Sequence, residues 1–92
     1  MQNNIQIIVT GKVQGVFFRK FAHQKANELN IRGFVANQEN GTVKIVAVGE
    51  QENLTALVEW CHTGSPGSVV NKVEVTNATT IANYKKFEIS WF

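Results

Sequence analysis

The order in which strand-like and helix-like apolar patterns follow one another constrains the fold of this chain more than any other feature. Alternating or β-branched apolar residues predict strands, whereas apolar residues that recur at helical spacing predict helices. One helical stripe covers about Arg19–Leu29, and a second lies between Gly49 and Gly64. The segments with the strand pattern are Ile5–Thr10, Gly33–Glu39, Thr42–Val48, Val69–Thr76 and Lys85–Phe92.

Turn residues between these segments indicate how they connect. Asn40-Gly41 predicts a tight hairpin, because both residue types accept a positive φ. Asn30 is suited to a left-handed cap at the end of the first helix. The resulting order is β-α-β-β-α-β with one further strand at the C-terminus. This predicts an α+β fold of the ferredoxin-like kind: a βαββαβ sandwich whose antiparallel sheet carries two helices on one face and a short extra C-terminal strand.

Size and charge narrow the class of protein further. The 92 residues suffice for one domain, 1–92, and are too few for two. A net charge of +2 is too balanced for a partner bound mainly by charge, so we expect neither nucleic acid nor a membrane. Cys61 has no second cysteine to pair with, and we see no signal peptide or membrane-spanning run. We therefore expect a cytoplasmic protein and take a monomer as the working hypothesis.

The segment Gly11–Lys20 is the first candidate for a functional site, with the sequence Gly-Lys-Val-Gln-Gly-Val-Phe-Phe-Arg-Lys. It joins a predicted strand to a predicted helix, and its glycines allow consecutive N–H groups to converge. The start of a helix adds unpaired N–H groups and the positive end of the helix dipole. Arg19 adds a planar, charged group that suits phosphate oxygens. Taken alone, the pattern fits an anion site and an ordinary strand–helix turn equally well.

A polar residue at the end of the next strand is the second candidate. Side chains alternate between the two faces of a strand, so Val35 and Asn37 share one face. If Val35 packs beneath the helices, Asn37 points to the same side, close to the loop. An Asn that pairs with nearby backbone at a strand end is common, so this position alone does not indicate a function.

The residue types that are missing limit the possible chemistry. The chain contains no Asp, which excludes an aspartyl-phosphate nucleophile and Asp-based metal clusters. His23 and His62 lack metal-ligand spacing with Cys61. We therefore expect any phosphate chemistry to proceed without a metal or a cofactor.

Two motifs in register match a known family. The segment Gly11–Arg19 resembles the acylphosphatase signature, Gly-x-Val-Gln-Gly-Val-x-Phe-Arg. Gly33–Asn37, followed by Gly41–Val43, resembles the second signature of that family, in the family's order and at its usual separation. The resemblance spans nearly the whole chain. Its departures are mild: Asn30 stands where Gly is frequent, and Asn40 where Asp is frequent.

The resemblance implies an enzyme that hydrolyses the mixed anhydride between a carboxylic acid and phosphate, with no metal or cofactor. In this family the residue at the Arg19 position binds the phosphoryl group, and the residue at the Asn37 position orients the attacking water. The phosphate-binding residues carried over by the resemblance are Gln14, Gly15, Val16, Phe17, Phe18 and Arg19.

Two non-catalytic alternatives remain open. RNA-recognition domains share the βαββαβ plan, and Arg32–Phe34 is similar to the start of one of their motifs. However, this segment lies on the second strand rather than the third, and no further aromatic residues follow at alternate positions. The other alternative is a phosphate- or carboxylate-binding module without turnover, for which Asn37 would be dispensable.

Several other polar residues have two interpretations. His23 lies one turn after Arg19 and could approach a bound phosphate, although exposed helical histidines are ordinary. Cys61 falls on an apolar stripe, which favours a core role over a nucleophile. Arg32 is either a surface residue or the partner of a glutamate. Three lysines could attract an anion to the loop or simply be solvated: Lys12, Lys20 and Lys25.

Overall fold

The computed structural model describes residues 2–78 and 83–90 of the chain. It contains the predicted order of elements, each within a few residues of the predicted bounds. In chain order the elements are β1 (Gln2–Lys12), α1 (Phe18–Glu28), β2 (Arg32–Asn37), β3 (Val43–Glu50), α2 (Gln51–Thr63), β4 (Val69–Asn77) and β5 (Phe87–Ile89). Of the helices in these residues, neither is long and apolar enough to cross a membrane.

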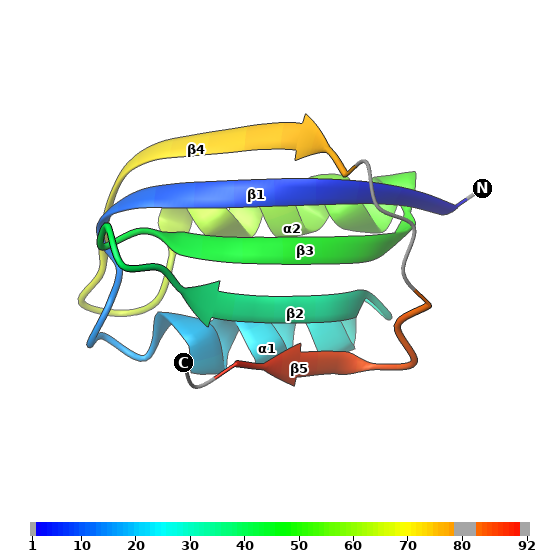
Figure 1. Ribbon diagram of the computed structural model, residues 1–92, viewed down its shortest axis with the longest axis horizontal. Helices are drawn as coiled ribbons and strands as arrows, with labels where there is room; N and C mark the ends of the chain where they lie inside the picture. Colours follow the sequence, from blue (N-terminus) through cyan, green and yellow to red (C-terminus); the bar gives the residue numbers. More distant parts are fainter. Residues whose placement is uncertain (1, 79–82, 91–92) are drawn as a thin grey trace.

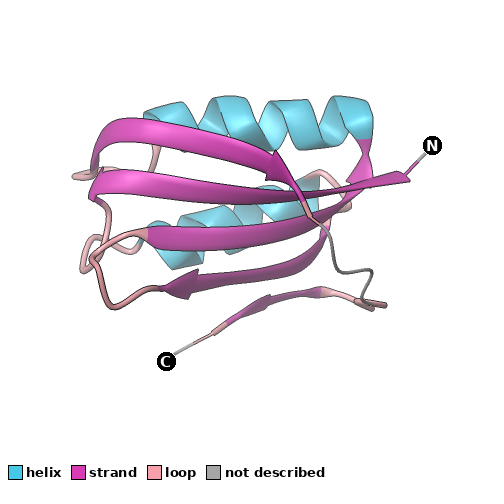
Figure 2. Ribbon diagram, turned by 45° about the horizontal axis from the view of Figure 1, so that its top comes forward, coloured by secondary structure: helices cyan, strands magenta, loops and turns pink. Residues whose placement is uncertain are grey.

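The strands form one sheet in the order β4-β1-β3-β2-β5. Figure 1 shows both helices behind this sheet, on one face, with α2 behind β1 and β3 and α1 behind β2 and β5. Figure 2 shows the same two layers from another side. The ferredoxin-like α+β fold expected from the sequence is therefore confirmed.

The C-terminal strand differs from the expected antiparallel arrangement. The pairings β1–β3, β1–β4 and β2–β3 are antiparallel, whereas β5 pairs parallel with β2. The physical reason is that β4 runs opposite to β2, so a chain that reverses direction once after β4 must follow β2. The sheet is thus mixed, and β5 ends at the same edge as β2 (Figure 1). Of the predicted segment Lys85–Phe92, residues 91–92 lie outside the described residues.

The apolar side chains that alternate along the strands and recur at helical spacing along the helices form one continuous buried core. Ile5, Ile7 and Val9 of β1 are buried beneath the helices, as their alternation predicts. The buried face of α1 consists of Phe18, Ala22 and Ala26. That of α2 consists of Leu54, Leu57 and Cys61. These faces meet in a single cluster of buried side chains, which holds α1, and therefore the loop that precedes it, against the sheet.

The turn between β2 and β3 differs in detail from the predicted two-residue hairpin. The Gly41 N–H donates to the Gln38 carbonyl at 3.1 Å, and the Gln38 N–H donates to the Thr42 carbonyl at 2.9 Å. Gly41 has a positive φ of 88°, but Asn40 does not share it. Instead, the Asn40 side-chain oxygen accepts from the Thr42 N–H at 3.2 Å. This local bond favours a turn with a single left-handed residue, which is common in three-residue hairpin loops.

Gly11 is part of the sheet rather than of the loop, contrary to the expectation that both Gly11 and Gly15 would shape the loop. It lies in β1 with a φ of 138°, at an irregularity in the pairing with β4. A Cβ at this position would stand 2.1 Å from the Val69 carbonyl oxygen. Only glycine therefore allows β1 and β4 to approach so closely just before the loop begins.

Arg32 connects the start of β2 to two other parts of the chain. It donates to the Tyr84 carbonyl at 3.2 Å, and a second guanidinium nitrogen bonds to the Gln2 side chain. These partners are a backbone carbonyl and an amide side chain, whereas the sequence left open a surface position or a glutamate partner. They lie at the opposite end of β2 from Asn37, so Arg32 has a structural role away from the loop.

Candidate active site

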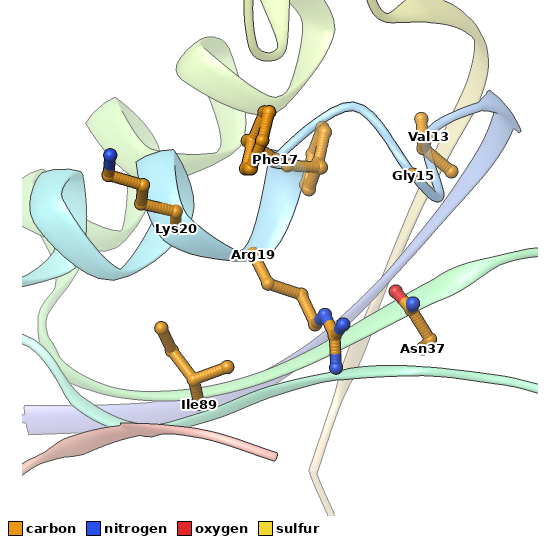
Figure 3. A pocket seen from close by; sticks show the side chains of 8 residues that line it. Val13, Gly15, Phe17, Arg19, Lys20, Asn37 and Ile89 are labelled. Atoms are coloured by element: carbon orange, nitrogen blue, oxygen red, sulfur yellow. The ribbon is translucent and has the colours of Figure 1, made fainter. Parts of the chain in front are cut away.

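A pocket of about 450 Å³ opens where the loop before α1 faces the ends of β2 and β5. Figure 3 shows the lining side chains, with Arg19 extending from the start of α1 toward Asn37. The sequence-predicted residues Gly15, Phe17, Phe18, Arg19 and Asn37 all line it. The lining residues that sequence analysis did not single out are Val13 and Ile89, whereas Lys20 was considered only as a lysine that could attract an anion.

The loop takes its shape from two residues with positive φ. Gly15 has a φ of 74°, as expected for a glycine in a tight loop. Phe17, however, also adopts the left-handed region, with φ 59° and ψ 24°. A non-glycine residue there costs about 1–3 kcal/mol, and such strain is concentrated at functional sites. Left-handed residues in a short loop turn neighbouring N–H groups toward a common point, which is the geometry of an anion-binding nest.

The start of α1 leaves its N–H groups available to a ligand. Phe17 is the N-cap residue, and within the described chain no side chain caps this end of the helix. The first turn also contains no acidic residue. The first N–H groups of a helix have no partner within the helix, and the dipole makes this end positive. The end of the helix that faces the pocket therefore favours an anion.

Side chains from two distant segments hold the loop in place. The Gln14 amide nitrogen donates to the carbonyls of Gln38 and Thr42, at 2.8 and 2.9 Å. On the other side, the buried Ser65 hydroxyl donates to the Val16 carbonyl at 2.9 Å. Because the C=O and N–H of a trans peptide point in opposite directions, this bond turns the Phe17 N–H away from Ser65. Gln14 and Val16 are therefore part of the loop's scaffold, although neither is among the pocket-lining residues.

The Arg19 side chain is positioned by the C-terminal strand. Its Nη1 donates to the Ser90 carbonyl at 2.6 Å, directly after β5 ends. The parallel pairing of β5 with β2 brings this carbonyl to the same edge as Asn37. A guanidinium carries five N–H donors in a fixed plane, so a bond to the backbone orients the whole group. The result is a cation with a defined direction at the pocket (Figure 3).

Asn37 lies on the helix-covered side of β2, as predicted, because it shares one face of the strand with the buried Val35. Its side-chain Oδ1 is buried and has no hydrogen-bond partner among the described residues. Leaving a buried polar atom unpaired costs about 1–3 kcal/mol, so such an atom calls for an explanation. A ligand or a water molecule held at the pocket would satisfy it. The alternative of an Asn paired with nearby backbone is not what the structure has at this oxygen.

Of the remaining candidates, His23 and Cys61 are not among the residues that line this pocket. The ring centroids of His23 and Phe87 are 6.1 Å apart, and His23 lines a different surface hollow together with Lys86 and Glu88. Burial raises the pKa of the Cys61 thiol to about 12, which makes it a poor nucleophile at neutral pH. Of the three lysines considered, Lys20 lines the pocket. Within residues 2–78 and 83–90, His, Cys and Glu side chains form no group of three that could hold a metal ion.

The fold and this geometry together define a small α+β protein with an anion-type site at a strand–helix loop. The acylphosphatase family profile matches residues 5–89. The chain is 43% identical to the acylphosphatase of Shewanella amazonensis over 86 residues, which is 94% of each chain. This chain therefore belongs to the acylphosphatase family, and both the family and the enzyme class predicted from the two signatures are confirmed.

Solved structures agree with this assignment. The crystal structure of acylphosphatase from Bacillus subtilis superposes with a TM-score of 0.92 at 36% identity, covering 99% of this chain and 100% of that chain. The structure of an acylphosphatase from Coxiella burnetii gives a TM-score of 0.91 at 37% identity, covering 97% of this chain and 93% of that chain. The similarity therefore extends over the whole fold rather than over the loop alone.

Proposed function

We propose that this enzyme hydrolyses the carboxyl–phosphate anhydride of acyl phosphates to a carboxylate and inorganic phosphate. The observation that carries the proposal is the convergence on one pocket beside the loop of Arg19 and the Asn37 oxygen, which has no hydrogen-bond partner within residues 2–78 and 83–90. We also propose that residues 1–92 form one domain that acts as a cytoplasmic monomer, without nucleic acid, metal or cofactor.

The phosphoryl group is bound by the loop backbone and by Arg19. The donors are the N–H groups of Gln14, Gly15, Val16, Phe17, Phe18 and Arg19, together with the Arg19 guanidinium. Phosphoryl transfer requires mainly positioning and stabilisation of charge on the equatorial oxygens, which fixed N–H donors supply without reorganisation. The Gln14 and Ser65 contacts support this role because they fix the loop before substrate arrives.

Asn37 orients the attacking water through its side-chain amide. The water oxygen forms a bond to phosphorus while the bond between phosphorus and the acyl oxygen breaks, and that electron pair leaves with the carboxylate. The proton lost by the water ends on a phosphate oxygen or in solvent. Holding the water in line with the leaving oxygen lowers the entropic part of the barrier.

The leaving group explains why few catalytic side chains suffice, and it gives a test. A carboxylate has a conjugate acid with a pKa of about 4, so it departs without a general acid. An alkoxide leaving group needs protonation, and general acids contribute about 10²–10⁴-fold. We expect the purified enzyme to hydrolyse benzoyl phosphate in EDTA and to be at least about 10²-fold less efficient, as kcat/KM, with an alkyl phosphate. Equal efficiency with both compounds would contradict the proposal.

A further inference from the structure

We propose that the apolar part of the same pocket binds the acyl group of the substrate, and that the enzyme selects acyl phosphates with aromatic acyl groups. This inference rests on the proposed function and extends it from the reacting bond to the substrate class. Three observations carry it. An exposed aromatic residue lies at the pocket, Phe17 and Ile89 form an apolar wall in the pocket that also contains the anion site, and the leaving group must depart in a defined direction.

Phe17 is the most exposed large hydrophobic residue among those described, at 73% of its accessible surface. Its backbone is also held in the left-handed conformation, which Asn or Gly would adopt at lower cost. Neither property helps the fold, because the side chain is not in the buried cluster. An aromatic ring kept in solvent beside an anion-type site is suited to stack on the apolar part of a ligand.

The apolar wall is continuous with the anion site. Phe17 precedes the helix that carries Arg19, and Ile89 precedes Ser90, whose carbonyl holds the Arg19 guanidinium. Phe17 and Ile89 also line the same pocket as Arg19, so a ligand whose phosphate is bound at Arg19 shares that pocket with their carbon side chains. The pocket volume of about 450 Å³ also exceeds what a phosphate ion needs and falls within the range of small-molecule sites.

The in-line arrangement of the attacking water and the leaving carboxylate directs the acyl group toward this apolar wall. In a phosphoryl transfer the attacking and leaving oxygens are roughly in line on opposite sides of phosphorus. In Figure 3 the Arg19 guanidinium lies between Asn37 on one side and Ile89 on the other. A water molecule at Asn37 therefore places the leaving acyl group on the Ile89 side. The Lys20 side chain is directed away from Arg19 in the same view, so its charge does not define this end of the pocket.

The test compares the selectivity of the enzyme for benzoyl phosphate over acetyl phosphate, as the ratio of the two kcat/KM values. Both compounds carry the same phosphate, so any change in the loop cancels in this ratio. We expect Phe17→Ala and Ile89→Ala each to lower the ratio about three- to tenfold, the range of a lost aromatic or apolar contact. Alanine retains a Cβ, so Phe17→Ala does not change the backbone strain, and the exposed ring contributes nothing to the core.

The control is Val75→Ala, which removes another exposed hydrophobic side chain, 44% accessible, from β4. Val75 is not among the pocket-lining residues, and its removal should leave the ratio unchanged. A ratio that stays unchanged in both pocket variants, while the wild type hydrolyses both compounds, overturns the inference alone. A wild-type protein that hydrolyses neither compound overturns the proposed function, and the inference with it.

Discussion

Arg19→Ala is expected to abolish both the turnover of acyl phosphates and the binding of inorganic phosphate. The guanidinium is held at the pocket by the Ser90 carbonyl, and the substitution removes the side chain that carries this fixed charge. Arginines that stabilise a transferring phosphoryl group contribute about 10³–10⁵-fold, so kcat/KM should fall by at least about 10³-fold. Inhibition of any residual activity by inorganic phosphate measures the loss of binding in the same sample.

The chain provides a matched control, because Arg32 is its only other arginine. Arg32 bonds to Tyr84 and Gln2, so Arg32→Ala should leave phosphate inhibition intact even if stability falls. Arg19→Lys keeps the charge but loses the planar fork, and it should recover only part of the activity. If Arg19→Ala retained wild-type phosphate inhibition, the assignment of the phosphate site would be wrong.

Asn37→Ala is expected to separate binding from catalysis. The substitution removes the amide that we assign to the attacking water, while the loop and Arg19 remain. Phosphate inhibition should therefore stay close to that of the wild type, and kcat should fall by about 10²-fold or more, as for other lost transition-state contacts. Steady-state kinetics with benzoyl phosphate, with and without added phosphate, measure both quantities.

The control for this variant is Asn27→Ala, which removes an exposed amide from α1 that contacts the His23 ring. This change should affect neither kcat nor phosphate inhibition. A fully active Asn37→Ala protein would refute the assignment of the water site. A variant that lost phosphate binding in parallel with kcat would instead place Asn37 in the binding of phosphate.

The helices, the order of the strands along the chain and the face of β2 on which Asn37 lies could all be predicted from the sequence. These features depend on local periodicity, and each buried stripe requires a partner, which leaves few ways to arrange the elements. Asn30 illustrates the local case, since its left-handed conformation, φ 55°, follows from its side chain and its place after a helix.

Features that depend on contacts between distant segments could not be predicted in this way. The Ser65 hydroxyl reaches the Val16 carbonyl across 49 positions in the chain, and nothing near Ser65 in the sequence indicates this contact. The position of Ile89 at the pocket depends on β5 pairing parallel with β2, which follows from the path of the chain after β4. The left-handed backbone of Phe17 opposes its residue preference and is maintained by the surrounding fold.

In the proposed mechanism a water molecule attacks phosphorus, and isotope labelling shows which product receives the oxygen of that water. Benzoyl phosphate is hydrolysed by the purified enzyme in water enriched in oxygen-18, with EDTA present, and both products are analysed by mass spectrometry. We predict that activity persists in EDTA and that the label enters inorganic phosphate. Label in benzoate would instead show attack at the carbonyl carbon, and it would contradict the roles assigned to Arg19 and Asn37.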